Sequence, residues 1–176
     1  MGKAVSSVGI SPNILTTAGF LFSILSGLLF AFRPSDSYFG AWALLAAGLM
    51  DILDGSVARA SNRVSKAGAF VDSSLDRISE VAVYSGIAFG GEASGFSVVL
   101  ALGLSMGVSY LRAKGESLNI KVSGIGIGER AERLLVLIIF AFAGYVWIGI
   151  YIIIIIAFVT FVHRFLLIVG TIKRPA

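Results

Sequence analysis

Long apolar stretches dominate this chain, and they constrain its fold more than any other feature. About 20 apolar residues are needed for a helix to cross the hydrocarbon core of a bilayer. The sequence divides into six such stretches, at 14–32, 38–59, 68–89, 93–111, 131–147 and 148–170. We therefore expect an all-α integral membrane protein with six transmembrane helices, forming a single domain over residues 1–176. The segment GYVWIG between the last two stretches is the best candidate for the turn that separates them.

Composition narrows the classes of function. Hydrophobic residues make up 57% of the chain, which is outside the range of ordinary soluble domains. The absence of cysteine excludes disulfides, thiolate catalysis and cysteine-ligated metals. The net charge of +4 favours anionic lipid headgroups or a phosphorylated substrate over nucleic acid as partners. The amino terminus lacks the features of a signal peptide, so we expect the first stretch to be retained as a span.

The basic residues predict the orientation of the chain, because short cytoplasmic loops retain lysine and arginine. In a six-span arrangement, Arg33 is the exception among the loop charges, and the other basic residues fall on the side of both termini. We therefore expect a cell-membrane protein with both termini, and the loops after the second and fourth spans, in the cytoplasm. The residues on that side are Lys3, Arg59, Arg63, Lys66, Arg112, Lys114, Lys121, Arg130, Arg133, Lys173 and Arg174.

Four aspartates lie inside the second and third apolar stretches: Asp51, Asp54, Asp72 and Asp76. Spacings of three and four residues put each pair on one helical face, and the two pairs lie at similar depth when counted from the loop that joins the stretches. Ionised carboxylates gathered in a membrane repel one another and lose hydration, and hard divalent cations relieve both penalties. Oxygen ligands suit Mg²⁺ or Mn²⁺, and no histidine lies nearby to favour zinc. We expect a cytoplasmic-side metal site, with two ions able to bridge a phosphate.

Small and basic residues complete a pattern around these acids. It reads D-x2-D-G-x2-A-R-x8-G-x3-D-x3-D, and its positions are Asp51, Asp54, Gly55, Ala58, Arg59, Gly68, Asp72 and Asp76. The pattern resembles the signature of the CDP-alcohol phosphotransferase family, membrane enzymes with six transmembrane helices that move a phospho-alcohol from a CDP-linked donor to an acceptor hydroxyl. Taken singly, each small residue is explained equally well by helix packing, and Arg59 by the cytoplasmic bias of basic residues.

The resemblance implies a role for each position of the pattern. Asp76 would be the catalytic base and, with the other three aspartates, a metal ligand. The resemblance also implies a homodimer. The implied CDP-binding residues are Asp51, Asp54, Gly55, Ala58, Arg59, Gly68 and Asp72.

The loop between the fourth and fifth stretches carries basic residues suited to a phosphate. The sequences SYLRAKGE and ERAERL resemble the phosphatidylinositol phosphate synthase branch of the family, apart from Gly115, which stands where that branch has alanine. The resemblance implies that Arg112, Lys114, Arg130 and Arg133 hold the phosphate of inositol 1-phosphate. The alternative is that these residues anchor the loop at the headgroups, paired with nearby glutamates. Arg164 could reach the same phosphate.

The glycines of the sequence GIGIG, at 124, 126 and 128, do not match a nucleotide-binding loop, and we expect a flexible interfacial loop there.

The expected reaction transfers a phosphatidyl-type group from CDP-diacylglycerol or CDP-archaeol to inositol 1-phosphate and releases CMP. Two alternatives keep the family: CDP-inositol as donor, which gives a di-inositol phosphate, or glycerol 3-phosphate as acceptor. A third belongs to another class, because intramembrane carboxylates also line ion or proton pathways in transporters. Such a pathway predicts acids along the whole membrane depth, whereas these four are confined to one half.

Overall fold

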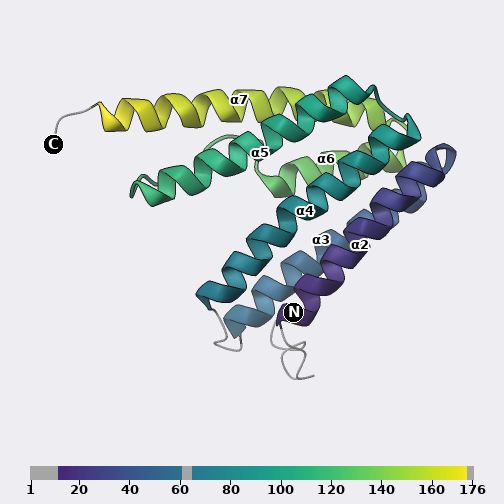
Figure 1. The fold of residues 1–176 in the computed structure, drawn as a ribbon, viewed down its shortest axis with the longest axis horizontal. Coiled ribbons are helices and arrows are strands. Elements are labelled where there is room, and N and C mark those ends of the chain that lie inside the picture. Colours follow the sequence, from purple (N-terminus) through teal and green to yellow (C-terminus); the bar gives the residue numbers. More distant parts are fainter. Residues whose placement is uncertain (1–11, 61–64, 174–176) are drawn as a thin grey trace. The chain divides into compact units, whose positions relative to one another are not determined.

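The computed structural model describes residues 12–60 and 65–173, and every regular element in these ranges is helical. This confirms the all-α prediction. In chain order the elements are α2 (Pro12–Phe32), the short 3-10 helix η1 (Pro34–Asp36), α3 (Ser37–Ala60), α4 (Lys66–Gly90), α5 (Gly95–Ser117), α6 (Arg130–Phe142) and α7 (Val146–Ile172) (Figure 1).

Four of the described helices are long and apolar enough to cross a membrane. They span Asn13–Phe32, Pro34–Val57, Gly95–Ser117 and Val146–Ile172. Helix α4 has 25 residues but carries Asp72, Asp76, Arg77 and Glu80 in its interior, which lowers its hydropathy. Helix α6 has only 13 residues. The described ranges contain six α-helices, of which four meet the criteria of length and hydropathy for a span, so the number of six spans stays a prediction.

Two helix ends, those of α5 and α6, differ from the sequence prediction by more than two residues. Helix α5 continues to Ser117, beyond the expected end at residue 111, so Arg112 and Lys114 lie in its last turns. The turn between α6 and α7 falls at 143–145, slightly earlier than the GYVWIG segment suggested. Gly144 adopts a positive φ of 76° there, a left-handed conformation that glycine accepts without steric cost, and this allows the chain to reverse.

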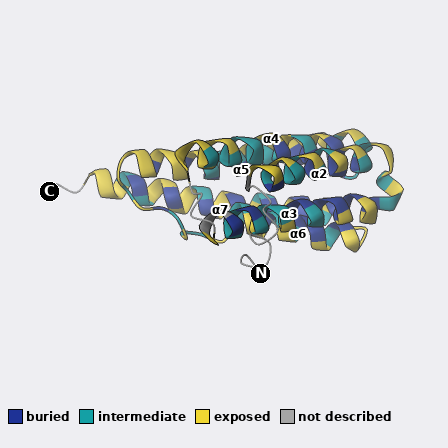
Figure 2. Cartoon of the chain, turned by 90° about the horizontal axis from the view of Figure 1, so that it is seen from below, coloured by how far each residue is buried: buried dark blue, intermediate teal, exposed yellow. Residues whose placement is uncertain are grey.

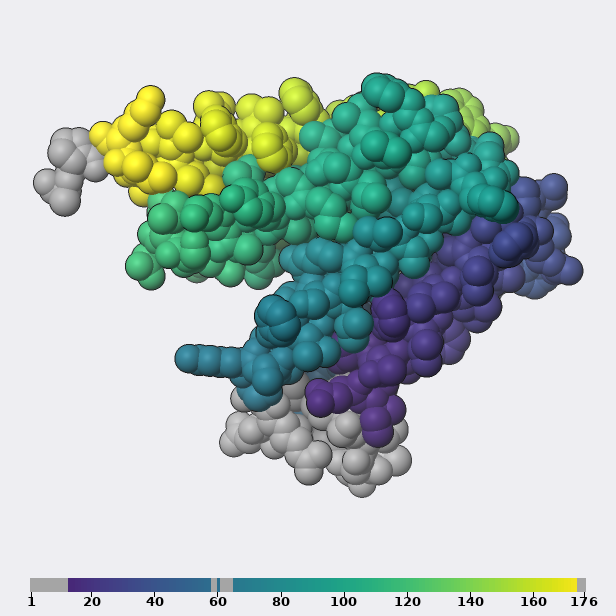
Figure 3. Space-filling model, in the orientation of Figure 1, coloured from purple at the N-terminus to yellow at the C-terminus, as the bar shows by residue number. Residues whose placement is uncertain are grey.

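The chain forms two compact units, Met1–Glu92 and Ala93–Ala176. In the first unit, α2 packs against both α3 and α4, and Figure 3 shows α2 and α4 in contact along one face. A Cβ added to Gly27 would lie 2.5 Å from the carbonyl oxygen of Ala82, and one added to Gly86 would overlap the backbone of Gly27. The backbones of α2 and α4 therefore approach as closely as small residues permit, as is typical of helices in membranes.

In the second unit, α7 packs against both α5 and α6. The hydroxyl of Ser97 on α5 donates to the hydroxyl of Tyr151 on α7, with 3.3 Å between the oxygens. Exposed residues run along the length of the helices and are not confined to their ends (Figure 2). Many are large and apolar, including Phe96, Phe158 and Phe165. Such a surface suits lipid and not water.

Candidate active site

Three aspartates from two helices of the first unit converge. Each offers one carboxylate oxygen, and these three oxygens all lie within 4.8 Å of one another: Asp51 on α3, and Asp72 and Asp76 on α4. Oxygens on opposite sides of one Mg²⁺ lie about 4.2 Å apart, given a metal–oxygen distance of about 2.1 Å. Small side-chain rotations would therefore bring these oxygens onto a single ion. The three carboxylates are half-buried and fit a hard divalent cation.

Asp54 differs from the other three acids. Its side chain is buried, with 6% of the residue exposed, and its Oδ2 accepts a hydrogen bond from the Thr16 hydroxyl of α2 at 2.7 Å. Asp54 is not part of the group whose oxygens lie within 4.8 Å. Residues three apart on a helix point about 60° apart, so Asp51 faces α4 while Asp54 turns toward α2. The four acids thus lie in one region, but the structure brings three of them together.

The remaining positions of the pattern frame these acids. Gly55 follows Asp54 on α3 and is half-buried. Gly68 lies in the first turn of α4, where its N–H donates to the hydroxyl of Ser65, the capping residue, at 3.0 Å. This cap satisfies one of the free N–H groups at the helix start and fixes where α4 begins. The side chains of Ala58 and Arg59 lie outside the described part of the structure.

A cation flanks the candidate base on its own helix. Arg77 Nη1 lies 3.7 Å from Asp76 Oδ2, and the same nitrogen donates to the carbonyl oxygen of Ser73 at 2.7 Å. The Asp76 side chain is 18% exposed and that of Arg77 is 37% exposed. The carboxylate is therefore partly accessible, and a fixed positive charge lies beside it.

The four predicted phosphate ligands of the second unit have different environments. Arg112 Nε donates to Glu116 Oε1 at 3.1 Å on the exposed surface of α5, which is the pairing with glutamate considered as an alternative. Lys114 is exposed one turn from the end of α5. Arg130 is half-buried at the first position of α6. Arg133 is 2% exposed, and its Nη1 donates to the carbonyl oxygen of Gly128 at 2.6 Å.

A buried ion pair holds the loop before α6. Arg164 on α7 is 1% exposed and donates from Nη2 to Glu129 Oε1 at 2.6 Å. Its Nε donates to the carbonyl oxygen of Ile125 at 2.9 Å, and its Nη1 to that of Val108 at 3.3 Å. Glu129 Oε1 also accepts the N–H of Gly124 at 3.0 Å. Arg164, which the sequence suggested as a further phosphate ligand, thus joins α5, α7 and the loop.

Burial raises the pKa of Glu129, but the Gly124 N–H and the Arg164 guanidinium outweigh this effect and hold the pKa below its ordinary value. The carboxylate therefore stays ionised at neutral pH and balances the charge of buried Arg164.

Two of the three glycines of this loop, Gly126 and Gly128, serve close packing, which differs from the expectation of a flexible loop. A Cβ added to Gly126 would lie 2.5 Å from Thr160 Cγ2, and one added to Gly128 would lie 2.7 Å from the carbonyl oxygen of Ile156. Gly126 also has a φ of 90°, which side chains rarely tolerate. The loop backbone therefore lies directly against α7 and is tied to it by the Glu129–Arg164 pair.

Comparison with known proteins identifies the family. The chain matches the CDP-alcohol phosphatidyltransferase family over residues 9–171. It belongs to this family. Family membership makes the chain a transferase, which answers the alternative of an ion or proton transporter. Together with its long apolar helices, it also makes this phosphatidyltransferase a membrane protein.

Among similar proteins, the archaetidylinositol phosphate synthase of Pyrococcus horikoshii is 37% identical over 164 residues. The matched region covers 93% of the present chain and 86% of the Pyrococcus protein. The crystal structure of Mycobacterium tuberculosis phosphatidylinositol phosphate synthase (PgsA1) with CDP-DAG bound is similar with a TM-score of 0.82 and 26% identity, over 99% of this chain and 96% of that one. PgsA1 in complex with manganese and citrate is similar with a TM-score of 0.83 and 26% identity, over 99% and 91% of the two chains.

Two features of the phosphatidyltransferase were missed by sequence reasoning. The first is Thr16, which lies on the face of α2 that also carries Gly19, Ser23 and Ser26 at helical spacing. This stripe of small and polar residues was a usable signal that Thr16 points toward a neighbouring helix. The second is the structural role of Arg164, for which the sequence offered no partner at fixed spacing, because Glu129 lies 35 residues away.

Proposed function

We propose that this phosphatidyltransferase transfers a phosphatidyl-type group from a CDP-linked lipid, CDP-diacylglycerol or CDP-archaeol, to inositol 1-phosphate and releases CMP. The observation that carries the proposal is the convergence of Asp51, Asp72 and Asp76 from two helices. A similar protein is named as an archaetidylinositol phosphate synthase, and a similar structure is that of a phosphatidylinositol phosphate synthase with CDP-DAG bound. The CDP-DAG bound to PgsA1 supports a CDP-linked lipid as donor, and both names support an inositol phosphate lipid as product.

In the proposed reaction, Asp76 accepts the proton of the acceptor hydroxyl as its oxygen attacks the β-phosphorus of the donor. A new phosphorus–oxygen bond forms, the bond between this phosphorus and the bridging oxygen of CMP breaks, and CMP leaves. Asp51, Asp54 and Asp72, with Asp76, would hold one or two Mg²⁺ or Mn²⁺ ions, which neutralise diphosphate charge and improve the leaving group. The manganese complex of PgsA1 supports this choice of metal.

Nucleotide binding is assigned to the same part of the first unit. We assign CDP binding to Asp51, Asp54 and Asp72 together with Gly55, Ala58, Arg59 and Gly68. Gly55 directly follows Asp54, and Gly68 lies four residues before Asp72; neither has a side chain, so their backbones offer room for a ligand.

The acceptor phosphate is assigned to Arg112, Lys114, Arg130 and Arg133 of the second unit. Arg130 and Arg133 lie in the first turn of α6, where free N–H groups and the helix dipole favour an anion. The exposure of Arg112 and Lys114 supports access to a soluble substrate. Arg133 is buried, so its proposed contribution is to hold the Gly128 carbonyl and, with it, the loop that precedes Arg130.

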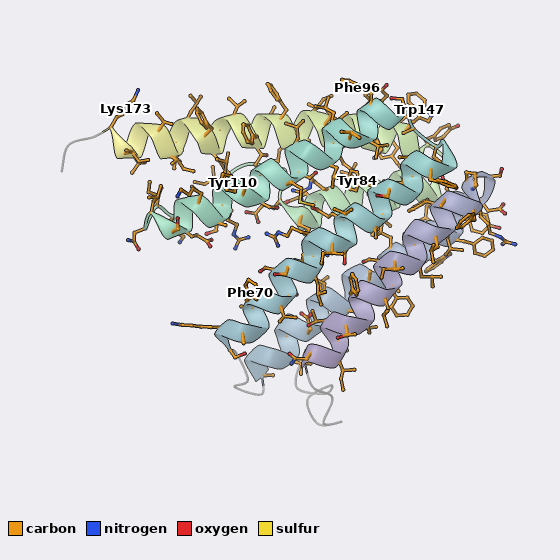
Figure 4. The ribbon with its side chains drawn as sticks, viewed as in Figure 1. Phe70, Tyr84, Phe96, Tyr110, Trp147 and Lys173 are labelled. Carbon is orange, nitrogen blue, oxygen red and sulfur yellow. The ribbon has the colours of Figure 1, made fainter. Side chains whose placement is uncertain are left out.

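We also propose six membrane spans with both termini in the cytoplasm of the cell, one domain over both units, and a homodimer. In the second unit, exposed Phe96 and Trp147 lie at the end where α5 and α7 begin, whereas Lys173 lies at the opposite end (Figure 4). Aromatic residues favour membrane interfaces, and lysine favours the cytoplasmic side. The family match across residues 9–171 supports a single domain. Light scattering of the purified protein in detergent tests the dimer.

The central experiment measures CMP release by purified protein with Mg²⁺ or Mn²⁺ and one donor at a time: CDP-diacylglycerol, CDP-archaeol or CDP-inositol. Each donor is paired with inositol 1-phosphate, inositol or glycerol 3-phosphate. We expect release with a lipid donor and inositol 1-phosphate, and little with inositol, which lacks the phosphate for the basic residues. Release with glycerol 3-phosphate but not inositol 1-phosphate would reject the acceptor, and release with CDP-inositol alone would reject the lipid donor.

The role of Asp76 is tested by Asp76→Asn, which keeps the shape of the side chain and removes its ability to accept the proton. We expect turnover to fall at least 100-fold, because general base catalysis contributes roughly 10²–10⁴-fold, while CDP binding is retained. Asp36→Asn is the matched control, because Asp36 lies in η1, outside the group of acids, and should leave turnover unchanged. Normal turnover of Asp76→Asn would reject the base.

A further inference from the structure

A hydrogen bond from Thr16 links α2 to the proposed metal site. Its hydroxyl oxygen lies 2.7 Å from Asp54 Oδ2, although the two residues are 38 positions apart in sequence. Asp54 is the buried member of the four aspartates, whereas Asp51, Asp72 and Asp76 are half-buried. One oxygen of the buried carboxylate thus has a fixed partner on another helix.

We propose that Thr16 is a positioning residue for the metal site: its hydroxyl fixes the Asp54 carboxylate so that its other oxygen can ligate a divalent cation. The inference rests on the proposed metal-dependent function. Hydrogen-bond partners of metal ligands hold the ligands in orientation, and their loss typically weakens metal binding about 10–100-fold.

The packing of α2 on α3 keeps Thr16 in place. Gly19, one turn after Thr16, lies so close to α3 that an added Cβ would be 3.3 Å from Met50 Cβ and 3.4 Å from the carbonyl oxygen of Ala47. Because Met50 directly precedes Asp51, this contact fixes α2 against the turn of α3 that carries the acids. The close approach at Gly19 therefore resists a shift of α2 that would separate the hydroxyl from Asp54.

Thr17, the next residue, shows the hydrogen bond that a threonine of α2 makes when its hydroxyl does not reach another helix. The Thr17 hydroxyl donates to the carbonyl oxygen of Asn13 at 2.9 Å, within its own helix. Such local bonds are the usual arrangement for threonine in helices. Adjacent threonines on one helix thus use their hydroxyls differently, which provides a matched control.

The experiment titrates Mn²⁺ into purified, metal-free protein without donor or acceptor and follows free Mn²⁺ by electron paramagnetic resonance. Thr16→Val keeps the shape of the side chain and removes the hydroxyl, Thr16→Ser restores a hydroxyl, and Thr17→Val makes the same change one residue away. We expect Thr16→Val to weaken Mn²⁺ binding about 10-fold, and Thr16→Ser and Thr17→Val to stay within about twofold of the parent protein. Circular dichroism checks that each variant is folded.

The outcomes separate this inference from the proposed function. If the parent protein fails to bind Mn²⁺, the metal site itself is wrong. If the parent binds but Thr16→Val binds equally well or more tightly, the metal site stands and the positioning role of Thr16 is rejected. Should Thr16→Val lose its fold, the comparison passes to Thr16→Ser and Thr16→Ala, and equal Mn²⁺ affinity of these two also rejects the role.

Discussion

Removing the negative charge from the Glu129–Arg164 pair should destabilise the second unit substantially. In Glu129→Gln, the guanidinium of Arg164 remains 1% exposed but loses its counter-charge. Breaking a buried ion pair on one side costs about 3–5 kcal/mol. Two features reduce the cost here: the Glu129 side chain is 29% exposed, so water reaches the site, and Arg164 keeps the carbonyl oxygens of Ile125 and Val108 as acceptors.

We therefore expect a loss of about 2 kcal/mol in the free energy of unfolding, the size of one hydrogen bond between charged groups. For a chain of this length, that corresponds to a fall of about 4–8 °C in Tm. The assay is thermal unfolding in detergent, followed by far-ultraviolet circular dichroism. Glu116→Gln is the control, because Glu116 pairs with Arg112 on the exposed surface, where such pairs contribute about 0–1 kcal/mol. Equal shifts in the two variants would refute the reasoning from burial.

Three further predictions concern packing and pH. Gly86→Ala should lower the free energy of unfolding by about 1–3 kcal/mol, because the added Cβ would overlap the backbone of α2. The control Gly103→Ala, whose added Cβ has no atom within 4 Å, should be neutral or slightly stabilising, and equal Tm values for the two variants would contradict the close approach. Gly126→Ala should destabilise more than Gly124→Ala in thermal unfolding, because both glycines have positive φ but only Gly126 also meets a side chain of α7. The lowered pKa of Glu129 means that its ionised form stabilises the fold above its ordinary value of 4.5, so the stability difference between the parent and Glu129→Gln should shrink as pH falls below 4.5; a constant difference between pH 7 and pH 3 would contradict this.

Much of the fold could be predicted from the sequence because hydropathy is a strong local signal. The expected stretches at 14–32 and 68–89 lie within α2 and α4 and miss their ends by at most two residues. The end of α5 was missed because the apolar run stops near residue 111, whereas the helix continues through Arg112 and Lys114. Charged residues end a hydrophobic pattern without ending a helix, since lysine and arginine are good helix formers. Hydropathy thus predicts the apolar part of each helix better than it predicts where the helix ends.

The acids of the site show where helical spacing suffices and where it fails. The spacing of four residues put Asp72 and Asp76 on one face of α4, and a carboxylate oxygen of Asp51 on α3 lies within 4.8 Å of theirs. Helical spacing could not place Asp54, because a 60° difference in direction, which is about one sixth of a turn, decides whether a side chain faces α4 or α2. That decision depends on which helix packs against α3, a long-range property set by contacts such as Gly19 with Met50. A motif therefore predicts the residues that can ligate a metal, while the packing of the neighbouring helix determines how each of them is held.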